Sequence, residues 1–281
     1  PVQGTDAGGT TLVVTGTNFA DGPLLYCKLG SLAASQGTWL SSTSVRCVTP
    51  ASGSTGNATV QISNNNLDFV SGPNYRYLAA PTVAALSVAT GPVRGGTVVS
   101  VSGTNFDVSG PSGYVKCLFG TREVTASASS NTTWIICTSP AGSAGAVAVK
   151  LSFSNGVDYT PTSTTFTYYA DQTVSSISPV NGGVGGGTNV TVTGSGFAGA
   201  TQCKFGSTAV ATATVVNGQT VMCLSPVGSA GSVSVEVSQN GLDYTQDGVR
   251  FEYQATATVS AVYPVQGTDA GGTTLVVTGT N

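Results

Sequence analysis

Three stretches of the chain repeat the same order of glycine, cysteine, proline and aromatic residues, and this repeat constrains the fold more than any other feature. The stretches open with PVQGTDAGGTTLVVTGTNF, VATGPVRGGTVVSVSGTNF and PVNGGVGGGTNVTVTGSGF, which start at Pro1, Val88 and Pro179. Recurrence of the same pattern at such regular intervals indicates repeated structural units. The sequence predicts three complete domains and the start of a fourth: residues 1–80, 81–171, 172–256 and 257–281.

The end of the chain repeats its beginning. Residues 264–281 are identical to residues 1–18, whereas the three units differ from one another at most positions. The higher-order period is therefore 263 residues (264 − 1), or three domains. Two interpretations stay open: a local duplication of one domain start, or an array that continues with this period.

Alternating apolar and polar residues predict β-strands. Residues 189–193 read NVTVT, a pattern typical of a strand with one buried and one solvated face. The paired glycines before such strands permit backbone angles that other residues avoid, so they predict turns. The NG steps at Asn155 and Asn240 predict hairpins between two late strands. The expected fold class is therefore all-β.

The six cysteines form three pairs with a common separation of 20 residues: Cys27 and Cys47, Cys117 and Cys137, Cys203 and Cys223. Six cysteines allow 15 pairings, but the repeated spacing favours one local disulfide per domain. Each such disulfide stabilises its domain by roughly 3 kcal/mol and requires an oxidising compartment, so we expect an extracellular or cell-surface chain. The alternatives are free thiols in a cytosolic protein, and a zinc site, which the absence of histidine and of any C-x-x-C pair disfavours.

Charged residues are sparse and scattered. They make up 7% of the chain, with 9 basic and 12 acidic side chains and a net charge of −3. No run of charge could hold nucleic acid or an anionic membrane, and no apolar stretch is long enough to span a bilayer, so neither partner is expected. The sequence also offers no identifiable general acid or base, so we expect no catalytic residue, no cofactor and no enzyme activity.

The order and spacing of these features resemble the IPT/TIG family of immunoglobulin-like domains. The shared string is P-x-x-G-x-x-x-G-G-T, then G-x-x-F, C-x-x-G, C-x-x-P, N-G-x-D-[FY] and a closing aromatic pair such as Phe251 and Tyr253. Two departures are Val88 in place of the first proline and Asn66 in place of a glycine. The resemblance implies tandem immunoglobulin-like β-sandwiches of about seven strands each, but such a fold does not determine a function.

Three N-x-[ST] sequons are candidates for N-glycosylation, at Asn57, Asn131 and Asn189. Strand alternation predicts that Asn57 and Asn189 face solvent, whereas Asn131 lies in an expected loop before Trp134. Glycans would help to keep a sheet surface so poor in charge soluble. A plain threonine-rich β surface is the alternative.

One aspartate recurs at the same place in each unit, as Asp68, Asp158 and Asp243. A calcium site is one interpretation, but a single carboxylate per domain is too few for an ion that takes about six to eight oxygens. Turn capping is therefore favoured, and no metal site is expected. Trp39 and Trp134 each precede a second cysteine and are expected to pack locally rather than to stack on sugars.

Three functions fit the sequence. The first is a structural component of an extracellular fibre, surface hair or stalk, with neighbouring copies of the chain and covalent glycans as partners. Residues 78–87 and 170–179, expected to be short linkers without a flexible Gly/Ser tract, favour this function. The second is a receptor or adhesin ectodomain that binds a protein or carbohydrate, which predicts an exposed aromatic patch. The third is an accessory module of a carbohydrate-active enzyme, whose catalytic domain would lie outside these residues.

Overall fold

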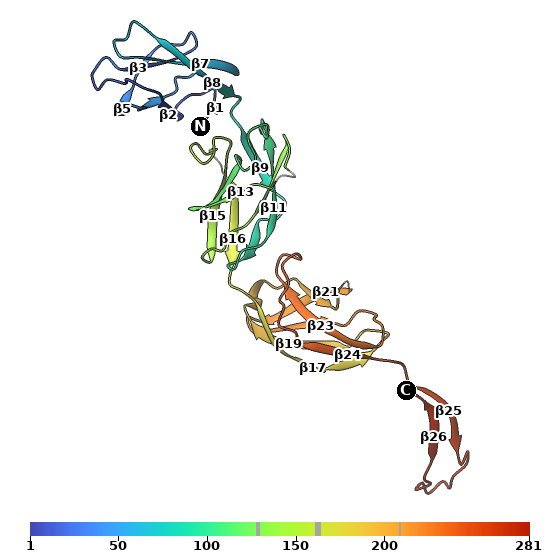
Figure 1. The fold of residues 1–281 in the computed structure, drawn as a ribbon. Coiled ribbons are helices and arrows are strands. Elements are labelled where there is room, and N and C mark those ends of the chain that lie inside the picture. Colours follow the sequence, from blue (N-terminus) through green and yellow to red (C-terminus); the bar gives the residue numbers. More distant parts are fainter. Residues whose placement is uncertain (128–129, 161–163, 208) are drawn as a thin grey trace. The chain divides into compact units, whose positions relative to one another are not determined.

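The computed structural model describes residues 1–127, 130–160, 164–207 and 209–281. Within these residues the regular structure is almost entirely β-strand, with one short 3-10 turn at Phe197–Gly199. The strands form three two-layered sandwiches and a terminal hairpin (Figure 1). The chain divides into two compact units, Pro1–Tyr169 with the first two sandwiches and Ala170–Asn281 with the third sandwich and the hairpin. The predicted all-β class is therefore confirmed.

The first sandwich packs a five-stranded sheet against a three-stranded sheet. The larger sheet has the order β1 (Gln3–Thr5), β8 (Val70–Leu78), β7 (Gly56–Ser63), β3 (Tyr26–Leu29) and β4 (Ser35–Gln36). The smaller sheet has the order β2 (Thr11–Thr15), β6 (Ser44–Val48) and β5 (Thr38–Ser41). Alternate apolar residues of both sheets meet in a core of Leu12, Leu25, Leu29, Val45, Val60, Ile62, Tyr75, Tyr77 and the cysteine pair.

The second sandwich repeats this plan with a five-stranded and a three-stranded sheet, but its smaller sheet includes the first strand of the sandwich. Its larger sheet has the order β10 (Thr90–Pro92), β16 (Thr165–Tyr169), β15 (Gly145–Ser152), β12 (Lys116–Phe119) and β13 (Arg122–Thr125). Its smaller sheet has the order β14 (Trp134–Thr138), β11 (Val98–Thr104) and β9 (Thr82–Leu86). Here β9 pairs antiparallel with β11, whereas β10, which follows it in the chain, pairs parallel with β16 in the opposite sheet.

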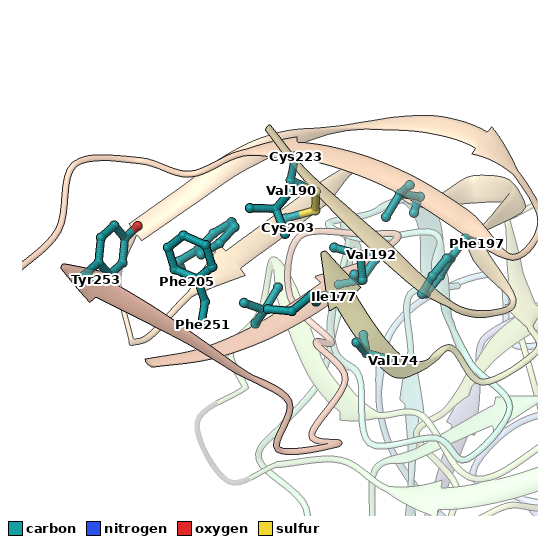
Figure 2. Packing of buried hydrophobic residues seen from close by; sticks show 14 residues of the cluster. Val174, Ile177, Val190, Val192, Phe197, Cys203, Phe205, Cys223, Phe251 and Tyr253 are labelled. Atoms are coloured by element: carbon teal, nitrogen blue, oxygen red, sulfur yellow. A yellow bond between two sulfur atoms is a disulfide. The ribbon is translucent and has the colours of Figure 1, made fainter. Parts of the chain in front are cut away.

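In the third sandwich one long strand joins the two layers. The strand order is β17 (Thr173–Ser178), β19 (Asn189–Ser195), β22 (Thr220–Leu224), β21 (Ala209–Asn217), β20 (Gln202–Phe205), β23 (Gly231–Ser238), β24 (Arg250–Gln254) and β18 (Asn181–Gly183). One half of β21 pairs with β20 and the other half with β22, so both sheets are continuous through it. Figure 2 shows the core between them, with Phe205 and Phe251 beside each other and Val192 near Ile177.

The terminal hairpin consists of β25 (Thr258–Tyr263) and β26 (Val276–Thr280), which pair antiparallel. All but one of the residues from 258 to 281 are exposed, because no second sheet covers the two strands. The pairing of β25 with β26 repeats that of β9 with β11 and of β17 with β19, including a bulge near the same place. The hairpin thus has the local structure that opens a sandwich.

The expectation of two short linkers was wrong. Residues 78–87 and 170–179 are not linkers, because at least half of each segment is the first strand of a sandwich, β9 or β17. The connections that remain are residues 79–81 and 170–172. The NG steps lie, as expected, between two late antiparallel strands, but the connections are longer than a tight turn: residues 153–164 separate β15 from β16, and residues 239–249 separate β23 from β24.

Candidate functional site

One disulfide joins the two sheets of each sandwich. Cys27 of β3 bonds to Cys47 of β6, with Cα atoms 6.0 Å apart. The pairs Cys117 and Cys137, and Cys203 and Cys223, have Cα separations of 6.3 Å. All six side chains lie in the cores, where they pack as apolar groups and cross-link the layers. The cysteines are therefore structural rather than reactive.

A repeated hydrogen bond closes one end of each sandwich. The closing tyrosine of each unit donates from its hydroxyl to the carbonyl oxygen of the proline that follows the second cysteine: Tyr77 to Pro50 at 2.8 Å, Tyr168 to Pro140 at 2.7 Å, and Tyr253 to Pro226 at 2.7 Å. The first glycine of each pair has a positive φ, and a Cβ on Gly8 would lie 2.5 Å from the backbone nitrogen of Ala51. The repeated glycines, prolines and tyrosines thus pack together at one end of each sandwich.

Burial raises the pKa of several tyrosines within Pro1–Tyr169, most of all that of Tyr75 and Tyr159. Burial of Tyr75 raises the pKa of its hydroxyl to about 12, although the neighbouring hydroxyls of Thr10 and Thr49 lower that pKa in part. Burial also raises the pKa of Tyr159 to about 12, and its hydrogen bond to the carboxylate of Glu123 acts in the same direction. Both groups are neutral at physiological pH, which fits a structural role.

The recurring aspartates lie in turns. Asp68 accepts a hydrogen bond from Asn65 Nδ2 at 2.7 Å, and Asp243 accepts the equivalent bond from Asn240 at 2.6 Å. In the second sandwich the backbone N–H of Asp158 donates to the hydroxyl of Ser154 at 2.8 Å. Across the described residues no group of three or more His, Cys, Asp or Glu side chains could hold a metal ion.

The three sequon asparagines differ in their surroundings. Asn57 in β7 and Asn189 in β19 are exposed. Asn131 is half-buried, and its Oδ1 accepts hydrogen bonds from the N–H and hydroxyl of Thr133 and from the N–H of Trp134. Glycosylation at all three residues stays a prediction, with the geometry most open at Asn57 and Asn189.

The two tryptophans have local partners. The indole N–H of Trp39 donates to the carbonyl oxygen of Phe19 at 3.1 Å, and part of its ring reaches solvent. Trp134 is half-buried in β14 and lines a shallow hollow with Ser102 and Ile136. Neither ring lies in a deep pocket of the kind that holds a small ligand.

Direct hydrogen bonds and an ion pair connect the first and second sandwiches, which both lie within Pro1–Tyr169. Arg76 Nη1 lies 2.8 Å from Asp107 Oδ2 and donates to Ser109 Oγ at 2.7 Å. The buried amide of Gln3 donates to the carbonyl oxygen of Phe153 at 2.9 Å. Sequence reasoning missed this contact, because the counterparts of Arg76 in the other units are Thr167 and Glu252, so no repeated pattern marks it.

A groove of about 640 Å³ lies on the first sandwich, lined by Val14, Phe19 and Ile62 among others. Its apolar floor belongs to the core of the sandwich. Among the helices of the described residues, none is long and apolar enough to cross a membrane.

Comparison with known proteins identifies the family. The family model described as IPT/TIG domain matches residues 1–77, 81–168 and 173–253. Mouse fibrocystin-L is 32% identical over 208 residues, which cover 72% of this chain and 5% of the relative. Human fibrocystin-L is 28% identical over 300 aligned residues, which cover 99% of this chain and 6% of the relative. The chain thus spans a small part of these curated relatives.

Among solved structures, the extracellular region of plexin A4 aligns at 18% identity with a TM-score of 0.46, covering 96% of this chain and 26% of that chain. The buried disulfides and the family together place the chain outside the cell or at its surface. The tandem sandwiches and the family-model match over three segments of the chain lead to one conclusion. The chain belongs to the IPT/TIG domain family.

Proposed function

We propose that this chain is a structural segment of an extracellular fibre, surface hair or stalk built from tandem IPT/TIG domains. The observation that carries the proposal is the identity of residues 264–281 with residues 1–18, which gives a period of three domains. A repeated period suits a spacer, because every copy performs the same task. Its partners are neighbouring copies of the chain and covalent glycans, and its domains are residues 1–80, 81–171 and 172–256.

The contact between the first and second sandwiches supports a role as a structural spacer. Residues 79–81, between β8 and β9, are a short connection, and the ion pair of Arg76 with Asp107 and the bond from Gln3 act across it. A short connection with direct bonds on both sides restricts motion between two domains more than a flexible linker does. The absence of an identifiable acid, base or nucleophile in the sequence supports a role without catalysis.

A receptor or adhesin ectodomain is the second candidate. The observation in its favour is a set of exposed apolar side chains on the three-stranded sheet of the first sandwich, namely Val13, Trp39, Leu40 and Val48. Exposed apolar surface with an aromatic residue is typical of protein interaction sites. Such a site would bind a protein or carbohydrate partner.

Electron microscopy of the native assembly distinguishes the two candidates. An antibody against a loop of the second sandwich should label a fibre at regular intervals, one label per three-domain period. A matched antibody against the first sandwich should label with the same interval and a constant offset. Isolated short molecules with a single label each would contradict the fibre and favour the ectodomain.

A further inference from the structure

The turn that holds the recurring aspartate is longer in the second sandwich than in the other two. Ser63, Ser152 and Ser238 occupy equivalent places, because each pairs across the sheet with the residue before the first cysteine of its sandwich. From this serine to the aspartate the chain advances five residues in the first and third sandwiches (68 − 63 and 243 − 238) but six in the second (158 − 152). The turn of the second sandwich therefore has one extra residue.

The extra residue changes which side chain holds the aspartate. Two residues after the serine, the first and third sandwiches have Asn65 and Asn240. Each asparagine accepts the N–H of the aspartate with its Oδ1 and donates from its Nδ2 to the carboxylate, at 2.7 Å and 2.6 Å. The second sandwich has Ser154 at this place, and its hydroxyl accepts the N–H of Asp158 at 2.8 Å. A serine has no amide group that could donate to the carboxylate as well.

One oxygen of Asp158 is consequently left without a donor. Part of the residue reaches solvent, but its Oδ2 atom is buried and accepts no hydrogen bond from any residue that the structure describes. Burying a carboxylate oxygen without a donor costs free energy, so such an atom in a folded protein calls for a physical explanation. The two equivalent aspartates show which kind of group is missing, namely a nitrogen that donates a hydrogen bond.

A cavity of about 580 Å³ is lined by Asp158. Its walls come from both of the first two sandwiches. Thr5 and Leu78 belong to the first sandwich, residues 79–81 connect the two, and Leu151 belongs to the second. The cavity therefore lies where the two sandwiches meet, which is a common place for small-molecule sites.

Hydrogen bonds hold the walls of this cavity in place. The amide of Gln3 donates to the carbonyl oxygen of Phe153 at 2.9 Å and ties the first sandwich to the turn that contains Asp158. Asn105 Nδ2 donates to the carbonyl oxygen of Ala80 at 3.0 Å and fixes the connection. The cavity is thus formed without a ligand, so binding does not have to order its walls.

The lining combines apolar walls with one negative acceptor. Leu78, Leu151 and Phe153 line the cavity and are at most 9% exposed. A ligand that fits this lining has an apolar body and a positively charged donor. A guanidinium prefers two parallel bonds to both oxygens of a carboxylate, whereas an ammonium acts as a compact point charge that suits a single oxygen. We propose that this cavity binds an alkylammonium group, whose nitrogen donates to Asp158 Oδ2 and whose carbon chain packs against Leu151 and Phe153.

A metal ion fits the cavity less well. Calcium takes about six to eight oxygen ligands, several of them carboxylates in most sites. In the part of the chain that the structure describes, no three His, Cys, Asp or Glu side chains are grouped so as to hold a metal. An ammonium group needs far fewer partners, because one charged hydrogen bond and apolar contacts along its chain suffice.

Binding at this cavity affects the contact between the two sandwiches. Because the walls come from both of them, separation of the sandwiches destroys the cavity. A bound ammonium group therefore stabilises the joined arrangement, as any ligand stabilises the state to which it binds. This effect goes beyond the proposed fibre and does not depend on it, since it requires only the first two sandwiches.

Titration of the full chain with hexylammonium chloride, followed by the backbone amide NMR signals of Ala80 and Leu151, tests the binding. We expect saturable shifts of both signals. The affinity should exceed that of hexan-1-ol, which has the same carbon chain without the charge, roughly tenfold. Hexanoate should not bind, because its carboxylate repels that of Asp158. Equal affinity for the amine and the alcohol, or no saturable binding of the amine, would overturn the proposal.

Ser154→Asn gives the second sandwich the amide group that the other two have. Its Nδ2 should satisfy Asp158 Oδ2, so the affinity for hexylammonium should fall roughly tenfold while the melting temperature of the second sandwich rises. The control is Asn155→Gly, which removes an exposed side chain from the same turn at a residue with φ 58° and should leave binding unchanged. Undiminished binding in Ser154→Asn would contradict the assignment.

Asp158→Asn tests the charge without adding a donor to the turn. This variant keeps the backbone N–H that bonds to Ser154, so the turn should fold. Hexylammonium and hexan-1-ol should then bind with similar affinity, because the negative charge is gone. A preference for the amine that persists in this variant would place the recognition of charge elsewhere and overturn the proposal.

Two further probes identify the source of the ligand. Nα-acetyl-lysine methylamide represents a lysine side chain of a partner protein, whereas hexylammonium represents a free small amine. Saturable binding of either supports an alkylammonium site, and the tighter of the two identifies its source. Calcium chloride is the third probe. Displacement of hexylammonium by an equal concentration of calcium would show that Asp158 belongs to a metal site and would overturn the assignment.

Discussion

The hydroxyl of Tyr77 donates a hydrogen bond of 2.8 Å to the carbonyl oxygen of Pro50, and this bond ties the last strand of the first sandwich to the turn after its second cysteine. Tyr77→Phe removes the donor and leaves a partly buried carbonyl oxygen without this bond, so we expect the free energy of unfolding of this sandwich to fall by about 1 kcal/mol. Hydrogen exchange of the backbone amides of β7 and β8 measures this loss of stability. Tyr263→Phe, at an exposed tyrosine, is the control and should change nothing.

The disulfides should stabilise each sandwich separately. Replacing both Cys117 and Cys137 with alanine should lower the stability of the second sandwich by about 3 kcal/mol, since the unfolded chain regains the freedom of a closed loop. Hydrogen exchange resolved by sandwich measures the loss. The third sandwich of the same variant is the internal control, and its exchange should match that of the unaltered chain.

The buried hydroxyl of Tyr75 makes the first sandwich sensitive to high pH. Its folded pKa of about 12 exceeds the ordinary value of 10, so its contribution is fully present below pH 10 and is lost as the pH rises towards 12. The loss amounts to about 2 to 3 kcal/mol. Stability measured from pH 9 to pH 12 should fall less steeply in Tyr75→Phe. Equal slopes in both chains would contradict the assignment.

The ion pair of Arg76 with Asp107 should couple the first two sandwiches weakly. The Arg76 side chain is 48% exposed, so solvent screens the pair and the coupling energy should stay below about 1 kcal/mol. A double-mutant cycle with Arg76→Ala and Asp107→Ala measures it. The coupling should shrink as salt is added. A coupling that is zero at low salt would show that the contact does not join the two sandwiches.

The sequons should be used unequally. In a chain secreted from a eukaryotic host, Asn57→Gln and Asn189→Gln should each remove the mass of one N-glycan, because both side chains are exposed. Asn131→Gln should remove a smaller average glycan mass, since Asn131 Oδ1 already accepts hydrogen bonds from the N–H groups of Thr133 and Trp134. Intact-mass measurement before and after enzymatic removal of N-glycans distinguishes these outcomes. Full occupancy at Asn131 with none at Asn57 would reverse the expected order.

Much of the fold was predictable because three different sequences in the chain encode the same domain fold. The alignment of Gly8 with its counterparts marked the turn before β2, and the alternation in residues 189–193 marked β19. The common spacing of the cysteines indicated a cross-link for each unit. Repeated positions carry information of this kind even where a single domain would be ambiguous.

The first strands could not be recognised, because a bulge breaks their alternation. Val174 and Ile177 both face the core although they are three residues apart, and the ladder shifts between Val174 and Ser176. A period of two therefore fails in these strands, and β9 and β17 resemble linkers. The contact of Arg76 with Asp107 was unpredictable for another reason: it joins residues of two domains and occurs without counterparts in the repeat.

The parallel pairing of the last strand of each sandwich with a short strand near its start has a consequence for a chain under tension. β1 with β8, β10 with β16 and β18 with β24 each run in the same direction. When the two ends of a sandwich are pulled apart, these paired strands are drawn in opposite directions along their length. Their hydrogen bonds are then loaded in shear and must break together rather than one after another. Each sandwich is thereby built as a mechanical clamp, with its disulfide limiting how far the chain can extend after the clamp yields.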